Sequence, residues 1–144
     1  MNNLVSIIMP CFNSEPFLRE AIGSVIQQTF SNWELIICDD GSTDKSVLVA
    51  REYAELDSRI RLTDNIYSVG APGARNSSLD VASGRYIAFL DSDDTWHPNH
   101  LSCMFNYLND NPLCRLVQTN ENWIRNGQLF NKKAYHQKPV DWAF

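Results

Sequence analysis

The chain has 144 residues, of which 44% are hydrophobic, 20% charged and 11% aromatic, proportions of a single globular domain rather than of a disordered or membrane-spanning protein. Seventeen acidic residues against twelve basic ones give a net charge of -5, and no basic run is longer than the pair Lys132-Lys133. We therefore expect no nucleic-acid partner, because phosphate-tracking surfaces are strongly basic.

The N-terminal part of the sequence predicts a strand, a helix and a second strand. The apolar, β-branched run from Val5 to Pro10 is typical of a buried strand. Residues 16–28 place apolar side chains at helical spacing, and Pro16 suits the first turn of a helix. A second buried strand is expected over residues 33–38.

The same alternation continues through the middle of the chain. A helix is expected from about residue 44 to residue 56, capped by Ser42 or Thr43. Residues 59–63 alternate charged and apolar side chains and predict a shorter, more exposed strand. After a turn-rich segment, a helix is predicted from about residue 74 to residue 82.

A fourth strand is expected over residues 85–90, followed by a helix over 99–109 and a fifth strand over 114–119. The dipeptide Asn126-Gly127 predicts a two-residue hairpin turn. Strands that alternate with helices indicate a largely parallel sheet covered on both faces.

Cysteine usage and the N-terminus bear on the cellular compartment. Cys11, Cys38, Cys103 and Cys114 form no C-x-x-C pair and lie in or beside apolar stretches, so we expect reduced, buried thiols. The stretch MNNLVSIIMP has no basic leader, and its apolar run is too short for an export signal or a membrane span. We expect no transmembrane segment and a cytoplasmic protein. Peripheral association with the inner face of the membrane is compatible with this expectation.

Three polar clusters follow the first, second and fourth predicted strands: PCFNSE, DDGSTD and DSDD. Turn and cap residues alone would explain any one of them. Their coincidence is more informative, because ligands of open parallel sheets bind outside the carboxyl ends of the strands.

The DSDD cluster indicates a divalent-cation site. In an extended strand Asp91 and Asp93 would face the same side and Ser92 the other, while Asp94 would cap the following turn. Hard cations such as Mn²⁺ or Mg²⁺ take one or two carboxylates together with waters and substrate phosphates. A cation here would also offset the repulsion between neighbouring carboxylates.

The chain carries, in this order, the blocks VSIIMPCFN, QQTFSNWELIICDDGSTD and GAPGARNSSLDVASGRYIAFLDSDD. Over about residues 4 to 110 it resembles the nucleotide-sugar-binding half of the family 2 glycosyltransferases. The resemblance implies an α/β fold of the GT-A type, a Rossmann-like sandwich with a mostly parallel central sheet and helices on both faces. It also implies that residues 1–144 form a single domain, the donor-binding half, with the acceptor-binding part missing.

The resemblance assigns roles to individual residues. Asp40 would recognise the nucleotide base, with the loop from Pro10 through Phe12 to Asn13 against the nucleoside. The D-x-D motif would place Asp91 and Ser92 at the nucleotide sugar, and both Asp91 and Asp93 at Mn²⁺ or Mg²⁺, Asp93 being the more direct ligand. Arg75 would either lie at the nucleotide edge or form a surface salt bridge.

The function implied is transfer of a sugar, with inversion, from a nucleotide-diphosphate sugar, by default a UDP-sugar, to a glycan, lipid or protein acceptor in polysaccharide biosynthesis. The metal would assist departure of the nucleoside diphosphate. The catalytic base is unknown and expected outside the chain, and the oligomeric state is left open. His136 or Lys138 could meet the metal or the diphosphate, but solvated loop residues are the simpler interpretation.

Three other interpretations stay open at this point. The chain could bind a nucleotide sugar without catalysis. It could be a metal-dependent nucleotidyltransferase, although PCFNSE lacks the glycines of a phosphate loop. It could be a flavodoxin-like receiver that holds Mg²⁺, although such a receiver would carry an acidic pair after its first strand.

Overall fold

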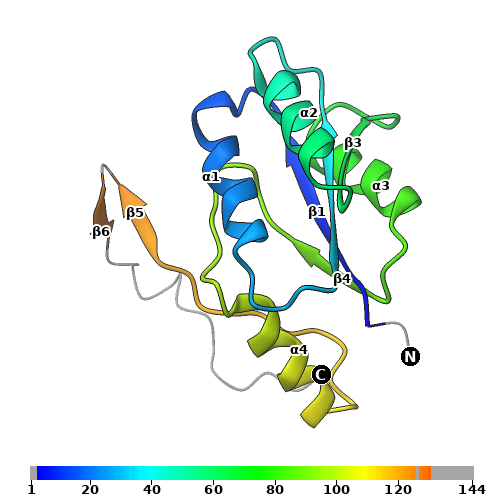
Figure 1. Cartoon of the computed structure of the whole chain (residues 1–144), viewed down its shortest axis with the longest axis vertical. Helices are drawn as coiled ribbons and strands as arrows, with labels where there is room; N and C mark the ends of the chain where they lie inside the picture. Colours follow the sequence, from blue (N-terminus) through cyan, green and yellow to red (C-terminus); the bar gives the residue numbers. More distant parts are fainter. Residues whose placement is uncertain (1–2, 126, 131–144) are drawn as a thin grey trace. The chain divides into compact units, whose positions relative to one another are not determined.

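The computed structural model describes residues 3–125 and 127–130, and the chain divides into two compact units, residues 1–101 and 102–144. The first unit contains a parallel sheet with strand order β3-β2-β1-β4 (Figure 1). These strands are β1 (Val5–Cys11), β2 (Trp33–Asp39), β3 (Ile60–Asp64) and β4 (Tyr86–Phe89). The predicted parallel sheet is therefore confirmed.

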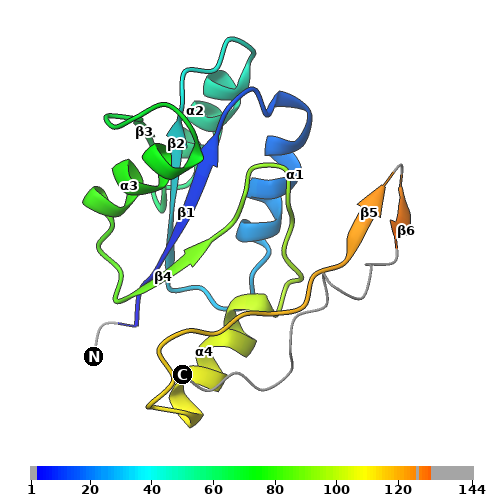
Figure 2. The same ribbon diagram turned by 180° about the vertical axis from the view of Figure 1, so that it is seen from behind.

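Helices cover both faces of this sheet (Figures 1 and 2). The helices α1 (Glu15–Ile26) and α2 (Ser46–Leu56) share one buried core with alternate residues of β1 and β2, such as Ile7 and Leu35. The helix α3 (Ala71–Val81) contacts β1, β2 and β3 and covers the opposite face. β1 and β2 are buried on both faces, which explains their continuous apolar sequences.

The strand order places a crevice at a defined point. The chain moves outward from β1 through β2 to β3 and then returns to β4 on the other side of β1. The loops that leave the carboxyl ends of β1 and β4 therefore lead in opposite directions. In open α/β sheets this reversal of strand order is where ligands bind.

Two helix starts differ from the prediction. The helix α3 begins at Ala71, three residues before the expected start, because Pro72 fits the first turn and Gly70 adopts a φ of 115° at the N-cap. The predicted caps of α2 are wrong: the helix begins at Ser46 with Lys45 at the N-cap position. The side chain of Asp44 instead accepts a hydrogen bond from the Ser46 amide at 2.9 Å.

In the C-terminal part of the chain, two predictions are confirmed and one is wrong. The hairpin of β5 (Trp123–Arg125) and β6 (Gln128–Phe130) is present, with Gly127 at a φ of 73°. The strand expected over residues 114–119 is absent. Leu116 in this run is 78% exposed, and its carbonyl accepts a hydrogen bond from the Cys114 thiol two residues away at 3.0 Å, a local contact rather than a ladder bond to a strand. The helix α4 (His100–Asp110) begins at the end of the first unit and confirms the last predicted helix.

All four cysteines are free, as predicted. Cys11 and Cys38 are buried, but Cys103 is exposed and Cys114 is partly exposed, so the expectation of burial was wrong for these two. No helix in the described part of the chain combines the length and the apolar character that crossing a bilayer requires.

A buried carboxylate, Glu34 of β2, lies at the edge of the sheet opposite the polar clusters. It accepts hydrogen bonds from the Ser6 hydroxyl at 2.5 Å and the Ser83 amide at 2.7 Å, and it pairs with Arg61 at 2.7 Å. Burial alone would raise the pKa of Glu34, but the hydrogen bonds from Ser6 and Ser83 and the charge of Arg61 outweigh burial and lower it.

We expect Glu34→Gln to lower the unfolding free energy by about 1–2 kcal/mol at neutral pH. The glutamine amide has only one acceptor oxygen, so it cannot accept hydrogen bonds from all the groups that now donate to the carboxylate. The ionised carboxylate stabilises the fold above its ordinary pKa of 4.5, and this contribution is lost as the pH falls through the lower folded value. Urea unfolding as a function of pH should show a smaller acid-induced loss in Glu34→Gln than in the wild type. The control is Glu52→Gln, which changes an exposed carboxylate paired with Arg19. An equally reduced acid-induced loss of stability in Glu52→Gln would contradict the role given to Glu34.

Gly84 allows close approach of the chain to β1. A Cβ at this position would lie 2.6 Å from both the amide nitrogen and the hydroxyl oxygen of Ser6. We expect Gly84→Ala to destabilise the protein by about 1–3 kcal/mol in urea unfolding. In contrast, a Cβ at Gly23 in α1 would meet open space, so Gly23→Ala should stabilise the protein by about 1 kcal/mol. Equal effects of the two substitutions would refute steric contact with Ser6 as the cause.

Candidate functional site

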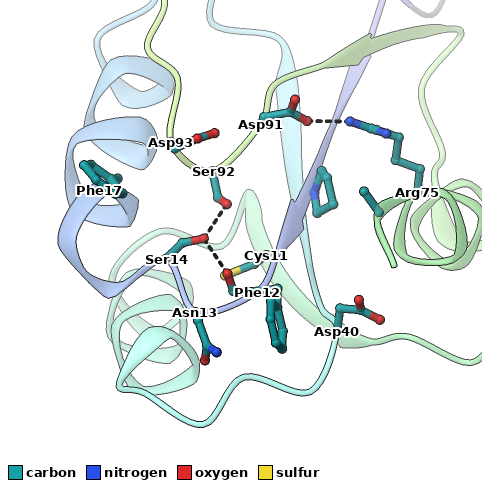
Figure 3. A pocket seen from close by; sticks show the side chains of 12 residues that line it. Cys11, Phe12, Asn13, Ser14, Phe17, Asp40, Arg75, Asp91, Ser92 and Asp93 are labelled. Carbon is teal, nitrogen blue, oxygen red and sulfur yellow. Dashed lines mark hydrogen bonds and ion pairs between the residues drawn. The ribbon is translucent and has the colours of Figure 1, made fainter. Parts of the chain in front are cut away.

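A cavity of about 310 Å³ lies at the carboxyl ends of β1 and β4, where the strand order reverses (Figure 3). Its lining comes from the loops after β1, β2 and β4 and from the start of α3. The lining residues are Pro10, Cys11, Phe12, Asn13, Ser14, Phe17, Asp40, Ala71, Arg75, Asp91, Ser92 and Asp93. All eight residues predicted for the site therefore line one cavity.

The D-x-D segment forms a tight turn rather than an extended strand. The Asp94 amide donates to the Asp91 carbonyl at 3.0 Å, so the expected alternation of Asp91 and Asp93 along a strand is wrong. Ser92 is buried, and its hydroxyl lies 2.7 Å from that of Ser14. This contact ties the turn to the loop after β1, while both carboxylates still line the cavity (Figure 3).

Arg75 on α3 forms the salt bridge that was one of its two interpretations, and it also lies at the cavity. Its guanidinium pairs with the Asp91 carboxylate at 2.6 Å, and Arg75 itself lines the cavity. The side chain of Asp91 remains 49% exposed. Asp91 is thus available to a ligand from the cavity, but it already has one cationic partner.

The carboxylates Asp91 and Asp93 are oxygen ligands suited to Mn²⁺ or Mg²⁺. Within the described ranges, no three acidic, histidine or cysteine side chains converge on one point. Two carboxylates are nevertheless a usual protein contribution to a magnesium-type site, in which substrate phosphates and waters complete the coordination. The donor set therefore fits a divalent cation that arrives with a phosphorylated ligand.

Asn13, at the end of the loop that was predicted to lie against the nucleoside, holds the neighbouring loop with its side chain. Its Oδ1 accepts hydrogen bonds from the backbone amides of Thr43 at 2.8 Å and Asp44 at 3.4 Å. The backbone amide of Asn13 donates to the Ser42 hydroxyl at 3.0 Å. Asn13 also adopts a φ of 48°, an uncommon conformation that Asn tolerates better than most residues. Its position at the cavity matches the prediction, but its carbonyl oxygen is already engaged.

Phe12 and Asp40 lie at the part of the cavity away from Asp93 (Figure 3). The ring of Phe12 is 57% exposed although it is large and apolar. Asp40 accepts hydrogen bonds from the Asn65 side chain at 2.6 Å and from the Gly70 amide at 2.7 Å. An exposed aromatic ring beside an oriented carboxylate is suited to a flat heterocycle with N–H groups.

Cys11, Ser14, Phe17 and Ala71 line the cavity but were not predicted. The available signal was position: Cys11 lies within the loop predicted to lie against the nucleoside, and Ser14 directly follows it. Burial raises the pKa of the Cys11 thiol, so the thiol stays protonated at neutral pH, which does not suit a nucleophile.

The three ring residues that follow the D-x-D turn do not line the cavity: Trp96, His97 and His100. Trp96 packs against the core and stacks on His100 with ring centroids 4.4 Å apart, and His97 accepts a hydrogen bond from the Asn99 amide. His100 therefore has a packing contact, and His97 has a local contact at the start of α4. His136 and Lys138 lie outside the described residues.

The sequence matches the family model of glycosyl transferase family 2 over residues 6–139. A curated relative, the UDP-Glc:alpha-D-GlcNAc-diphosphoundecaprenol beta-1,3-glucosyltransferase WfgD of Escherichia coli, is 44% identical over 135 residues. The match covers 94% of this chain and 52% of the relative. The chain spans about half the length of the curated relatives most similar to it.

This chain also resembles part of two solved structures. TarS of S. aureus, residues 1–349 in complex with UDP, has a TM-score of 0.66 and 27% identity, covering 74% of this chain and 32% of that 1–349 chain. Glucosyl-3-phosphoglycerate synthase of Mycobacterium tuberculosis, in complex with Mn²⁺, UDP and glucosyl-3-phosphoglycerate, has a TM-score of 0.55 and 26% identity, covering 67% of this chain and 36% of that one.

The parallel sheet, the cavity at its reversal point and these matches confirm the resemblance and the α/β fold of the GT-A type. The chain belongs to glycosyl transferase family 2.

Proposed function

We propose that this chain provides the donor-binding half of a metal-dependent, inverting glycosyltransferase that uses a nucleotide-diphosphate sugar, by preference a UDP-sugar. The observation that carries the proposal is one cavity with Asp40 and Phe12 at one part and Asp91 and Asp93 at another (Figure 3). A nucleoside diphosphate has the matching chemistry, a flat base at one end and an anionic diphosphate at the other.

The base end follows from hydrogen-bond chemistry. Uracil carries an N–H between two carbonyl groups, and an ionised Asp40 accepts such a hydrogen bond. Phe12 offers an exposed face for stacking, and Pro10 supplies a rigid apolar wall at the end of β1. Asn13 supports this end through its hydrogen bonds to the loop after β2.

The diphosphate end follows from charge. The chain has a net charge of -5, and Arg75 is the cation among the described residues that line the cavity. A diphosphate beside Asp91 and Asp93 would be repelled unless a cation lay between them. Asp93 and Asp91 would hold Mn²⁺ or Mg²⁺, which would supply charge neutralisation for the departing diphosphate.

Asp91, Ser92 and Arg75 would then cooperate at the centre of the donor. Arg75 orients the Asp91 carboxylate through their ion pair, and the contact of Ser92 with Ser14 holds the turn in place. A turn fixed in this way keeps its carboxylates in position before the donor arrives, which reduces the cost of ordering them on binding.

The acceptor and the catalytic base are assigned to the rest of a longer protein. The curated relatives are about twice as long as this chain, and residues 1–144 would be their donor-binding part. WfgD is named for transfer to GlcNAc-diphosphoundecaprenol. A lipid-linked glycan is therefore our proposed acceptor class, reached at the inner face of the membrane, with transfer in polysaccharide biosynthesis.

The metal site is tested by calorimetric titration of the chain with UDP in the presence and absence of Mn²⁺. We expect Mn²⁺ to strengthen UDP binding by about tenfold or more, since a charge-assisted contact is gained. Asp93→Ala should abolish this gain and leave the circular dichroism spectrum unchanged. Asp110→Ala, which removes an exposed carboxylate of α4 outside the cavity, should behave as the wild type. UDP binding that ignores Mn²⁺ would remove Asp91 and Asp93 from the metal site.

Transfer is tested with UDP-α-D-glucose and a prenyl-diphosphate-linked GlcNAc acceptor, followed by proton NMR of the product. A β-configured product is expected, because a single in-line displacement inverts the anomeric carbon. An α-configured product would disprove inversion. UDP binding without any product would assign this chain to donor binding alone, with catalysis dependent on the remainder of the protein.

A further inference from the structure

Asn65, which directly follows β3, lies beside Asp40 and lines a second cavity rather than the donor cavity. The Nδ2 group donates to the Asp40 carboxylate at 2.6 Å and to the Ser68 carbonyl at 3.0 Å. The Oδ1 atom accepts from the Tyr67 amide and from the Ser77 hydroxyl, each at 2.9 Å. All four hydrogen-bonding positions of the amide are therefore occupied.

These contacts leave the amide one orientation. The Tyr67 amide can only donate and the Ser68 carbonyl can only accept, so Oδ1 must face Tyr67 and the nitrogen must face Ser68 and Asp40. Ser77 is 3% exposed on α3, which ties the side chain of Asn65 to a packed helix. The donor aimed at Asp40 is thus held by the fold and not by solvent.

The other carboxylate oxygen of Asp40 is held from α3. The Gly70 amide donates to it at 2.7 Å, with Gly70 at a φ of 115° at the N-cap of this helix. Asp40 lines the donor cavity and also a second cavity of about 290 Å³ on the side of Asn65. Without the hydrogen bonds from Asn65 and Gly70, the Asp40 carboxylate could rotate into either of these two cavities.

We infer that Asn65 is a positioning residue that holds the Asp40 carboxylate toward the nucleobase and so determines the preference for a base with a ring N–H. The inference rests on the proposed function, because it assumes that Asp40 meets the base. Each carboxylate oxygen accepts two hydrogen bonds, so Asp40 retains capacity for a base N–H after Asn65 and Gly70 are satisfied. Asn65 itself would act through Asp40 and not touch the donor.

The variant that separates this role from a structural one is Asn65→Ser. A serine hydroxyl can still accept from the Tyr67 amide two residues on, as in the turns that Ser and Asn share. It is too short to reach Asp40. The local turn is therefore kept while the donor to Asp40 is removed. Asn32→Ala, in the exposed loop before β2, is the matched control.

The test measures binding of UDP and of inorganic pyrophosphate, a probe without a base, by calorimetry with Mn²⁺ present. Asn65→Ser should weaken UDP binding by about tenfold, leave pyrophosphate binding unchanged and leave the thermal unfolding midpoint near that of the wild type. Asp40→Ala should also weaken UDP binding, and the double variant Asp40→Ala/Asn65→Ser should be no weaker than Asp40→Ala alone, since no carboxylate is left to position.

Two results would overturn the inference while the proposed function stands: equal losses of UDP and pyrophosphate binding in Asn65→Ser, or losses that add in the double variant. Wild-type UDP affinity in Asp40→Ala would overturn the base contact itself and the inference with it. If Asn65→Ser does not fold, Ser77→Ala removes one donor to Oδ1 instead. A smaller loss confined to UDP is then expected, and its absence counts against the inference.

Discussion

Parallel pairing on both sides of β1 is the constraint on which the rest of this structure depends. Val5 to Ile8 pair with β2 on one side and with β4 on the other, so the loops after all three strands leave the same edge of the sheet. The reversal of strand order at β1 separates the return paths of those loops and leaves a cavity between them.

The loops at this edge are held by one another more than by their own turns. Asn13 accepts from the amide of Thr43, Glu15 donates its amide to Asp44, and Ser14 contacts Ser92. These bonds join the segments after β1, β2 and β4 before any ligand is present. A cavity built in this way is preorganised, and binding then orders few additional side chains.

The charge distribution explains why an acidic protein can belong to a family whose members use anionic donors. The cavity combines the carboxylates Asp40, Asp91 and Asp93 with the single cation that lines it among the described residues, Arg75. Arg75 offsets one carboxylate of the D-x-D turn. The remaining negative charge favours a donor that arrives with a divalent cation, which agrees with the Mn²⁺ in the complex of the M. tuberculosis relative.

The sequence by itself determined the alternation of strands and helices between residues 5 and 109, because buried strands and amphipathic helices leave local patterns such as the run Trp33–Asp39. It also predicted which loops line the cavity. Only the tertiary structure decided that the D-x-D segment turns, that residues 114–119 form no strand, and that Asn65 orients Asp40. Each of these depends on partners distant in the chain: Ser92 meets Ser14 across 78 residues and Asn65 meets Asp40 across 25. Such a strand or hydrogen bond forms only when folding brings a partner from a distant part of the chain close to it. The local periodicity of the sequence does not indicate that partner.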